Sequence, residues 1–217
     1  MSDLPTEFHS DLFPAINDHL EFRGLTYVFF EQFTLPTPEQ LELVASQLPG
    51  WSLITWGWWN GDADIEDQDI EAITDDGDSL STLSETIIPS DLLGEGREPQ
   101  PIEAVESLES IYAEQDNWGL VAISCPTWTT VAACEWRGCM NVAEPGEMAL
   151  ALKSWNTAWG VEVLAFGGEE DDADLLLRVP PAHTDNPDMI HAFAVAADQV
   201  TVFNDPALGQ LISLWFD

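Results

Sequence analysis

Residues 37–56 read TPEQLELVASQLPGWSLITW, and this stretch decides the expected fold. Thr37 stands directly before Pro38 and three residues before Gln40, which is the pattern of a capped helix start with proline in the first turn. One face of that helix carries the apolar residues Leu41, Val44, Ala45 and Leu48. A Pro-Gly pair ends the helix, and residues 51–56 follow at once as an apolar strand. A helix that leads directly into a strand predicts a mixed α/β chain.

Further strands and helices are expected on both sides of this stretch. Short β-branched or apolar runs predict strands at residues 25–30, 120–124, 161–166 and 175–179. Helical spacing or start signals predict helices at residues 11–21, 102–112, 148–159 and from Asn186 onward. Together they indicate an α/β fold with a mixed sheet and packed helices in a single compact unit, and an α+β arrangement is the alternative.

The composition divides the chain into three segments, which we expect to form one globular domain overall. Residues 1–60 are an N-terminal α/β segment, residues 61–101 an acidic segment with a connecting loop, and residues 102–217 a C-terminal α/β region. With 217 residues and 45% hydrophobic content, the chain can bury a sizeable core and does not have the composition of a disordered acidic tail.

The charge of the chain is far from balanced. Forty Asp and Glu face five Lys and Arg, for a formal net charge of −35. Charged residues make up 21% of the chain, slightly below the average of about 25% for soluble domains. The imbalance therefore comes as much from missing bases as from added acids. The electrostatic field of so large a negative charge repels phosphates and attracts basic proteins. Direct binding to nucleic acid or to an anionic membrane is therefore not expected.

The sequence favours a cytoplasmic setting. Its start, Met1-Ser2-Asp3, has neither a basic nor an apolar run, so no signal peptide is expected. No run approaches 18 uninterrupted apolar residues, so no membrane-spanning helix is expected either. The three cysteines form an odd and low count, which indicates no disulfide framework.

Motifs of catalysis and of cofactor binding are missing from the sequence. There is no Gly-x-Ser-x-Gly elbow, no phosphate loop and no GxGxxG. Cys134-x4-Cys139 together with Cys125 lacks a fourth ligand at zinc spacing, so we expect buried free thiols. His183 and His191 match no metalloenzyme motif. We therefore expect no catalytic residue, no cofactor and no metal centre, in a protein that is not an enzyme.

Two acidic clusters are the candidate partner-binding sites. The first holds nine acids in seventeen positions: Asp62, Asp64, Glu66, Asp67, Asp69, Glu71, Asp75, Asp76 and Asp78. The second is the run Glu169, Glu170, Asp171 and Asp172. The first cluster begins like a calcium loop, but Asp67 stands where the EF-hand needs glycine and Ile73 where it needs its bidentate glutamate. A solvated face, loose binding of divalent ions and presentation of carboxylates to a basic partner remain open.

Tryptophans stand next to the first acidic cluster. In Trp56-Gly57-Trp58-Trp59-Asn60 the rings cannot all lie on one face of a strand. At least one ring is therefore expected near the surface, either at the rim of a core cluster or on a binding platform. Trp58 and Trp59 accordingly join the candidate partner-binding residues, because tryptophan beside acids is a typical hot-spot composition.

The last hundred residues resemble a bacterial family catalogued only as domain of unknown function 4253. The resemblance covers about residues 118–217 and rests on Trp136, Gly138, Asn141, Leu152, Ser154, Trp155, Trp159, Gly160, Pro180, Pro181 and the closing Leu214-Trp215-Phe216-Asp217. Asp198-Gln199 stands where that family usually carries a Glu-His pair. The family has no established chemistry, so the resemblance implies an α/β domain and little more.

Three functions from different classes are compatible with these features. The first is a non-catalytic acidic protein that neutralises a basic protein acting on DNA or RNA, either as a DNA mimic inhibitor or as an immunity protein against a nuclease toxin. The second is a salt-adapted housekeeping protein or enzyme whose acidity serves solubility. The third is a divalent-cation binding protein. The coincidence of two acidic clusters with a near-absence of bases favours the first.

Overall fold

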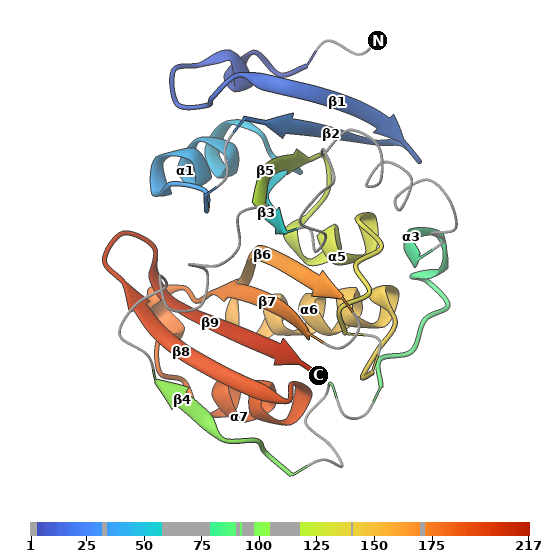
Figure 1. Cartoon of the computed structure of the whole chain (residues 1–217), viewed down its shortest axis with the longest axis vertical. Helices are drawn as coiled ribbons and strands as arrows, with labels where there is room; N and C mark the ends of the chain where they lie inside the picture. The colour runs from blue at the N-terminus through green and yellow to red at the C-terminus, as the bar shows by residue number, and fades with distance from the viewer. Residues whose placement is uncertain are drawn as a thin grey trace.

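The computed structural model describes residues 4–31, 34–57, 79–89, 92, 98–104, 118–139, 141–169 and 172–217. Within these residues nine strands form one sheet, in the order β1-β2-β5-β3-β6-β7-β9-β8-β4 (Figure 1). The strands are β1 Ile16–Phe22, β2 Leu25–Phe30, β3 Ser52–Gly57, β4 Ile102–Ala104, β5 Trp118–Ile123, β6 Glu162–Glu169, β7 Asp172–Arg178, β8 Gln199–Asp205 and β9 Gly209–Phe216. Neighbours are antiparallel except for the parallel pairs β3–β6 and β4–β8. The expected mixed α/β class in a single compact unit is confirmed.

The three longest helices lie where the sequence predicts helices, whereas two four-residue helices, at residues 79–82 and 130–133, were not predicted. They are α1 Pro38–Gln47, α3 Ser79–Thr82, α5 Thr130–Ala133, α6 Pro145–Trp159 and α7 Pro187–Ala196, with 3-10 turns η1 Thr6–His9, η3 Thr127–Thr129 and η4 Pro181–His183. The expected capping box opens α1: the Gln40 N–H donates to Thr37 Oγ1 at 3.2 Å, and the Thr37 N–H donates to Gln40 Oε1 at 2.8 Å. The expected strand after this helix is β3.

Helix α6 also forms as its sequence predicts. Met148, Leu152 and Trp155 are buried on one face, and the helix ends at Gly160, whose φ of 67° is left-handed. The Trp155 ring meets the Phe193 ring of α7 edge to face, with centroids 4.9 Å apart. In Figure 1 both helices lie behind strands β6 to β9.

The sheet has a core on each face because its side chains alternate. On the face covered by α5, α6 and α7 the strands contribute Tyr27, Ile54, Val121, Leu175, Ile212 and Leu214 to the main core. On the other face Val28, Leu53 and Leu120 pack with Val44 of α1, and a separate cluster around Leu164, Leu176 and Leu211 lies further along the sheet.

The helix expected at residues 11–21 is wrong, because residues 16–22 form the edge strand β1. A two-residue turn at Arg23 and Gly24, with φ angles of 51° and 80°, folds β1 back onto β2. Turns with two positive φ angles match the twist of a hairpin. Pairing with β2 therefore decides the conformation, whereas the spacing of apolar residues over eleven positions was ambiguous.

The C-terminal region brings two further differences. Ile102, which was expected to start a helix over residues 102–112, belongs to β4 and pairs in parallel with Val200 of β8; residues 105–112 lie outside the described residues. Strands β8 and β9 had no expected counterpart, although their antiparallel pairing spans seven residue pairs. Here long-range pairing, which leaves little local signal, determines the structure.

Figure 1 contains no membrane-spanning helix among the described residues, since none is both long enough and apolar enough to cross a bilayer.

Candidate functional site: an acidic pocket at the start of helix α6

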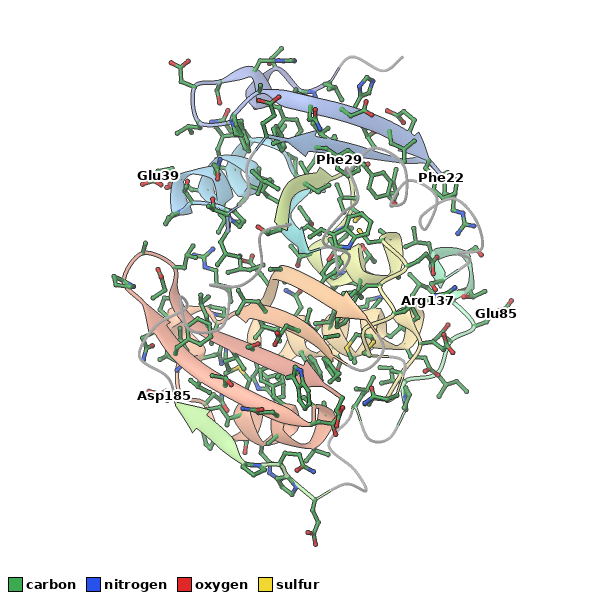
Figure 2. All side chains as sticks on the ribbon, viewed as in Figure 1. Phe22, Phe29, Glu39, Glu85, Arg137 and Asp185 are labelled. Atoms are coloured by element: carbon green, nitrogen blue, oxygen red, sulfur yellow. The ribbon has the colours of Figure 1, made fainter. Side chains whose placement is uncertain are left out.

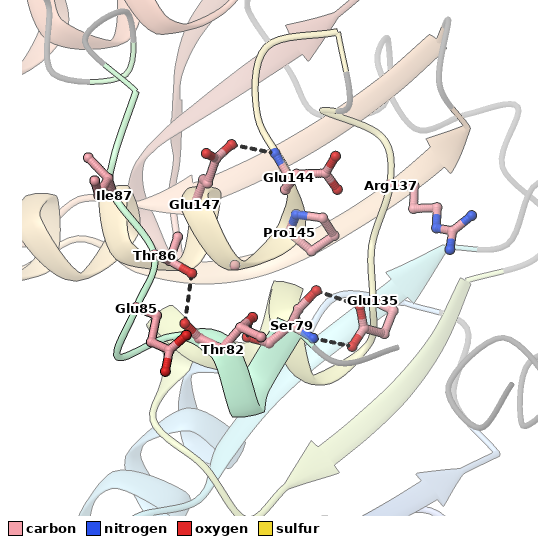
Figure 3. A pocket seen from close by; sticks show the side chains of 11 residues that line it. Ser79, Thr82, Glu85, Thr86, Ile87, Glu135, Arg137, Glu144, Pro145 and Glu147 are labelled. Atoms are coloured by element: carbon pink, nitrogen blue, oxygen red, sulfur yellow. Dashed lines mark hydrogen bonds between the residues drawn. The ribbon is translucent and has the colours of Figure 1, made fainter. Parts of the chain in front are cut away.

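A pocket of about 650 Å³ opens where α3, the segment after α5 and the first turn of α6 meet (Figure 3). Its lining carries four glutamates and one arginine: Glu85, Glu135, Glu144, Glu147 and Arg137. The other lining residues are Ser79, Thr82, Thr86, Ile87, Pro145 and Gly146. We call this site the acidic pocket. Four carboxylates against one guanidinium make it a site that favours a cation.

Glu135 holds one wall of the acidic pocket together. Its backbone has a left-handed φ of 49°, and its carboxylate accepts hydrogen bonds from the N–H of Ser79 at 3.1 Å and from Ser79 Oγ at 2.6 Å. Arg23, from the β1–β2 turn, lies 3.6 Å from the same carboxylate. Glu135 thus joins three segments that are far apart in the sequence, and its role is structural.

The first turn of α6 forms a second wall. Glu144 and Glu147 form a capping box in which the Glu144 N–H donates to Glu147 Oε2 at 2.9 Å. The partial positive charge of a helix start usually attracts anions. Here two carboxylates already occupy that position, so an incoming anion would meet like charge.

The remaining lining residues come from the segment after α3. Thr86 Oγ1 donates to the Thr82 carbonyl at 2.9 Å and extends the turn. Ile87 follows and is 82% exposed, and Glu85, on the same segment, is exposed as well. At Gly146 an added Cβ would lie 3.3 Å from the Ser79 carbonyl, so glycine lets α6 approach α3 closely. The rim therefore combines an exposed apolar side chain with carboxylates.

The polar side chains of the acidic pocket are carboxylates, hydroxyls and one guanidinium. None of its lining residues is a histidine or a cysteine. Among the described residues no group of three His, Cys, Asp or Glu is arranged to hold a metal ion.

All three cysteines are free and buried, and burial raises the pKa of each thiol; that of Cys125 rises to about 11. Protonated thiols are poor nucleophiles.

The buried thiols make the fold sensitive to alkali. Below the ordinary thiol pKa of 9.0, Cys125 is protonated whether the chain is folded or unfolded; between 9.0 and about 11 only the folded state keeps the proton. Stability is therefore full below pH 9 and falls as the pH rises through this window. Denaturant titrations should give a lower free energy of unfolding at pH 10 than at pH 8, and Cys125 alone should account for about 1 kcal/mol of this difference. In Cys125→Ala the difference in unfolding free energy between pH 8 and pH 10 should be smaller by that amount. An unchanged difference would contradict the raised pKa of the Cys125 thiol.

Three of the four bases in the described part of the chain are engaged by neighbouring side chains. Arg23 lies beside Glu135, and Arg178 Nη1 lies 3.5 Å from Glu162 Oε2. Lys153 Nζ lies 4.7 Å from the centre of the Trp128 ring. Local pairing thus leaves little positive charge in the described part of the chain to offset its acids.

The predicted binding residues are only partly visible in the structure. Outside the described residues lie Trp58, Trp59, Asp62, Asp64, Glu66, Asp67, Asp69, Glu71, Asp75, Asp76, Asp78, Glu170 and Asp171. The second acidic cluster lies at a hairpin, because β6 extends to Glu169 and β7 begins at Asp172. Glu169 and Asp172 are direct partners across this hairpin.

The residues of the acidic pocket were not predicted from the sequence. They are isolated acids, spread over residues 85–147, that only the fold brings together. One signal was present: Glu144, Pro145 and Glu147 have the spacing of a helix start, with acids in the first turn. That pattern indicates the helix, but it gives no sign of the facing wall at Ser79 and Glu135.

Comparisons with other proteins add no further information. No protein-family model matches the chain, and neither a curated protein nor a solved structure matches it. The resemblance of residues 118–217 to the family of unknown function therefore remains an expectation from the sequence.

Proposed function

We propose that this chain is a non-catalytic acidic protein that binds and neutralises a basic protein acting on nucleic acid, as a DNA mimic or as an immunity protein. The observation that carries the proposal is a net charge of −35 on a well-packed fold whose described bases are mostly engaged by neighbouring side chains. A field of this size steers basic partners and accelerates their association. We further propose a cytoplasmic location for this encounter.

The acidic pocket is the proposed contact in the described part of the chain. Lysine and arginine have apolar stems and charged heads. The exposed side chain of Ile87 can pack against such a stem, while Glu85 and Glu144 receive the head. Two predicted clusters, residues 62–78 and 169–172, would extend the contact.

The test compares binding to two basic probes, core histones and pancreatic ribonuclease, at low and high salt. We expect binding at low salt that weakens steeply as salt screens the charges. The double variant Glu85→Gln/Glu144→Gln should weaken binding about tenfold. Glutamine at position 144 keeps an oxygen for the helix cap, so the fold should persist.

The matched control carries the same charge change away from the acidic pocket. Glu39→Gln/Asp188→Asn removes two exposed carboxylates, from α1 and α7, and should change the affinity by about twofold at most. Equal losses in the two double variants would show that the overall field alone attracts the probes. Failure to bind either probe at low salt would overturn the proposal.

A second candidate function is salt adaptation, in which the acids keep the protein soluble in concentrated salt. Its specific observation is that described acids occur on well-separated parts of the surface: Glu39, Glu85 and Asp185 are exposed and lie far apart in Figure 2. Unfolding in salt-free buffer that molar KCl reverses would favour this candidate. A fully folded protein in salt-free buffer would count against it.

A further inference from the structure

The two halves of the sheet meet at a narrow seam. β3 pairs with β5 along all six of its residues, but with β6 only at Thr55↔Ala165 and Trp56↔Phe166. Toward their amino ends the two parallel strands have no register pairs, and a cavity of about 400 Å³ lies beside residues 52–53 and 162–164. Helix α1 forms its remaining wall. We call this space the seam cavity.

Eight of the thirteen residues that line the seam cavity are apolar. Leu41 and Val44 of α1 face Leu53 of β3 and Leu164 of β6 across it. Val44, Leu53 and Leu164 are buried members of the core, so packing fixes the base of the cavity. The accessible apolar surface belongs to the half-buried Leu41 and Trp51 and to the exposed Ala45. A largely apolar cavity of this size with a fixed base is typical of a small-molecule site.

Three charged side chains also line the cavity: Glu42, Glu162 and Arg178. Glu162 and Arg178 form an ion pair with 3.5 Å between Oε2 and Nη1, so the charge of Arg178 is offset locally. Glu42 is exposed, and no hydrogen-bond or ion-pair partner of its carboxylate occurs among the described residues. The seam cavity thus offers one unpaired carboxylate next to apolar walls.

We propose that the seam cavity binds a small organic monocation, an ammonium or amidinium group on an apolar body. The carboxylate of Glu42 would receive the cationic group, and the body would displace water from the walls of α1, β3 and β6. A bare metal ion does not fit such walls, because it prefers several oxygen ligands. Organic anions would be repelled by Glu42 and by the overall field.

Calorimetry with phenethylamine and benzamidine as probes tests the proposal, with phenylacetate as the anionic counterpart. Both cations should bind at millimolar or lower concentration, and phenylacetate should not. Glu42→Gln should weaken binding about fivefold, the upper end for an ion pair at a solvent-exposed carboxylate. Glu39→Gln, on the same helix but outside the lining, should stay within about twofold.

A cavity-filling variant separates binding inside the seam cavity from attraction to the surface. Ala45 lines the cavity and is exposed, so Ala45→Trp should fill the space without disturbing the core and should abolish binding. Unchanged binding in this variant, equal losses for Glu42→Gln and Glu39→Gln, or no binding of either cation would each refute the proposal. None of these variants touches the acidic pocket, so failure here leaves the proposed function standing.

Discussion

Replacing Trp155 with alanine is expected to lower the free energy of unfolding by about 3 to 5 kcal/mol. The indole is 3% exposed in the main core and packs edge to face on Phe193 of α7. Its removal leaves a large cavity between α6 and α7 that neighbouring side chains can fill only in part. The aromatic contact is lost as well, which adds about 1 kcal/mol to such a change.

Urea titrations of the wild type and of the Trp155→Ala variant measure this loss directly. Thr157→Ala, at an exposed position on the same helix, serves as the control and should stay within about 0.5 kcal/mol of the wild type. Trp155→Phe keeps an aromatic ring at the site and should fall between the two. A loss in Trp155→Ala below about 1 kcal/mol would mean that α6 and α7 are not packed through this residue.

The elements that the sequence predicts well are those with local signals. α1, α6 and α7 each begin at a cap followed by proline and keep their apolar residues on one face. A capped start and a helical spacing of apolar residues involve only residues that are close in the sequence, so both can be recognised without knowledge of the fold. For the same reason the strand β2, in which every residue after Leu25 is β-branched or aromatic, is predicted correctly.

Most of the strands that were wrongly assigned or missed lie at or near the ends of the sheet. β1 and β4 are its edge strands, and β8 lies next to β4. Each of them is stabilised by a partner strand, and β4 pairs with residues almost a hundred positions away. Edge strands also carry more polar side chains than central ones, as the exposed acids and histidine of β1 show. The spacing of apolar residues and the composition therefore did not decide the secondary structure of these segments.

The candidate site was harder to predict than the fold. Sequence clustering selects acids that are neighbours in the chain, whereas the acidic pocket gathers single glutamates from three separate segments. Contacts such as Ser79 with Glu135 join residues 56 positions apart. Only the fold defines such a site.

The residues that carry the family resemblance have structural roles wherever their contacts are described. Trp136 Nε1 donates to the Gly167 carbonyl at 3.3 Å, and its ring packs between Phe166 and Phe216. Asn141 Nδ2 donates to Asp198 Oδ2 at 3.2 Å and also to the Asp217 carbonyl. Gly160 provides the left-handed end of α6. A motif made of such residues indicates how the chain packs, and it carries no information about chemistry.

Gly138 gives the sharpest test of this packing. An added Cβ would lie 2.5 Å from Trp136 Cζ2 and would also clash with Ala173 Cβ on β7. Trp136 and Ala173 are both buried, at 4% and 1% exposure, and neither has room to move aside. Gly138→Ala should therefore destabilise the protein by about 3 kcal/mol, at the upper end of the usual cost of overpacking a core.

Gly119→Ala is the matched control, since an added Cβ at that position of β5 meets nothing within 4 Å. It should be neutral or stabilising by up to about 1 kcal/mol, because alanine reduces the freedom of the unfolded chain. Urea titrations of both variants separate the two effects. Equal stability of the two variants would show that the loop at residue 138 can move away from β7. A large difference would confirm that glycine is needed at position 138 for the Trp136 indole to pack against β7.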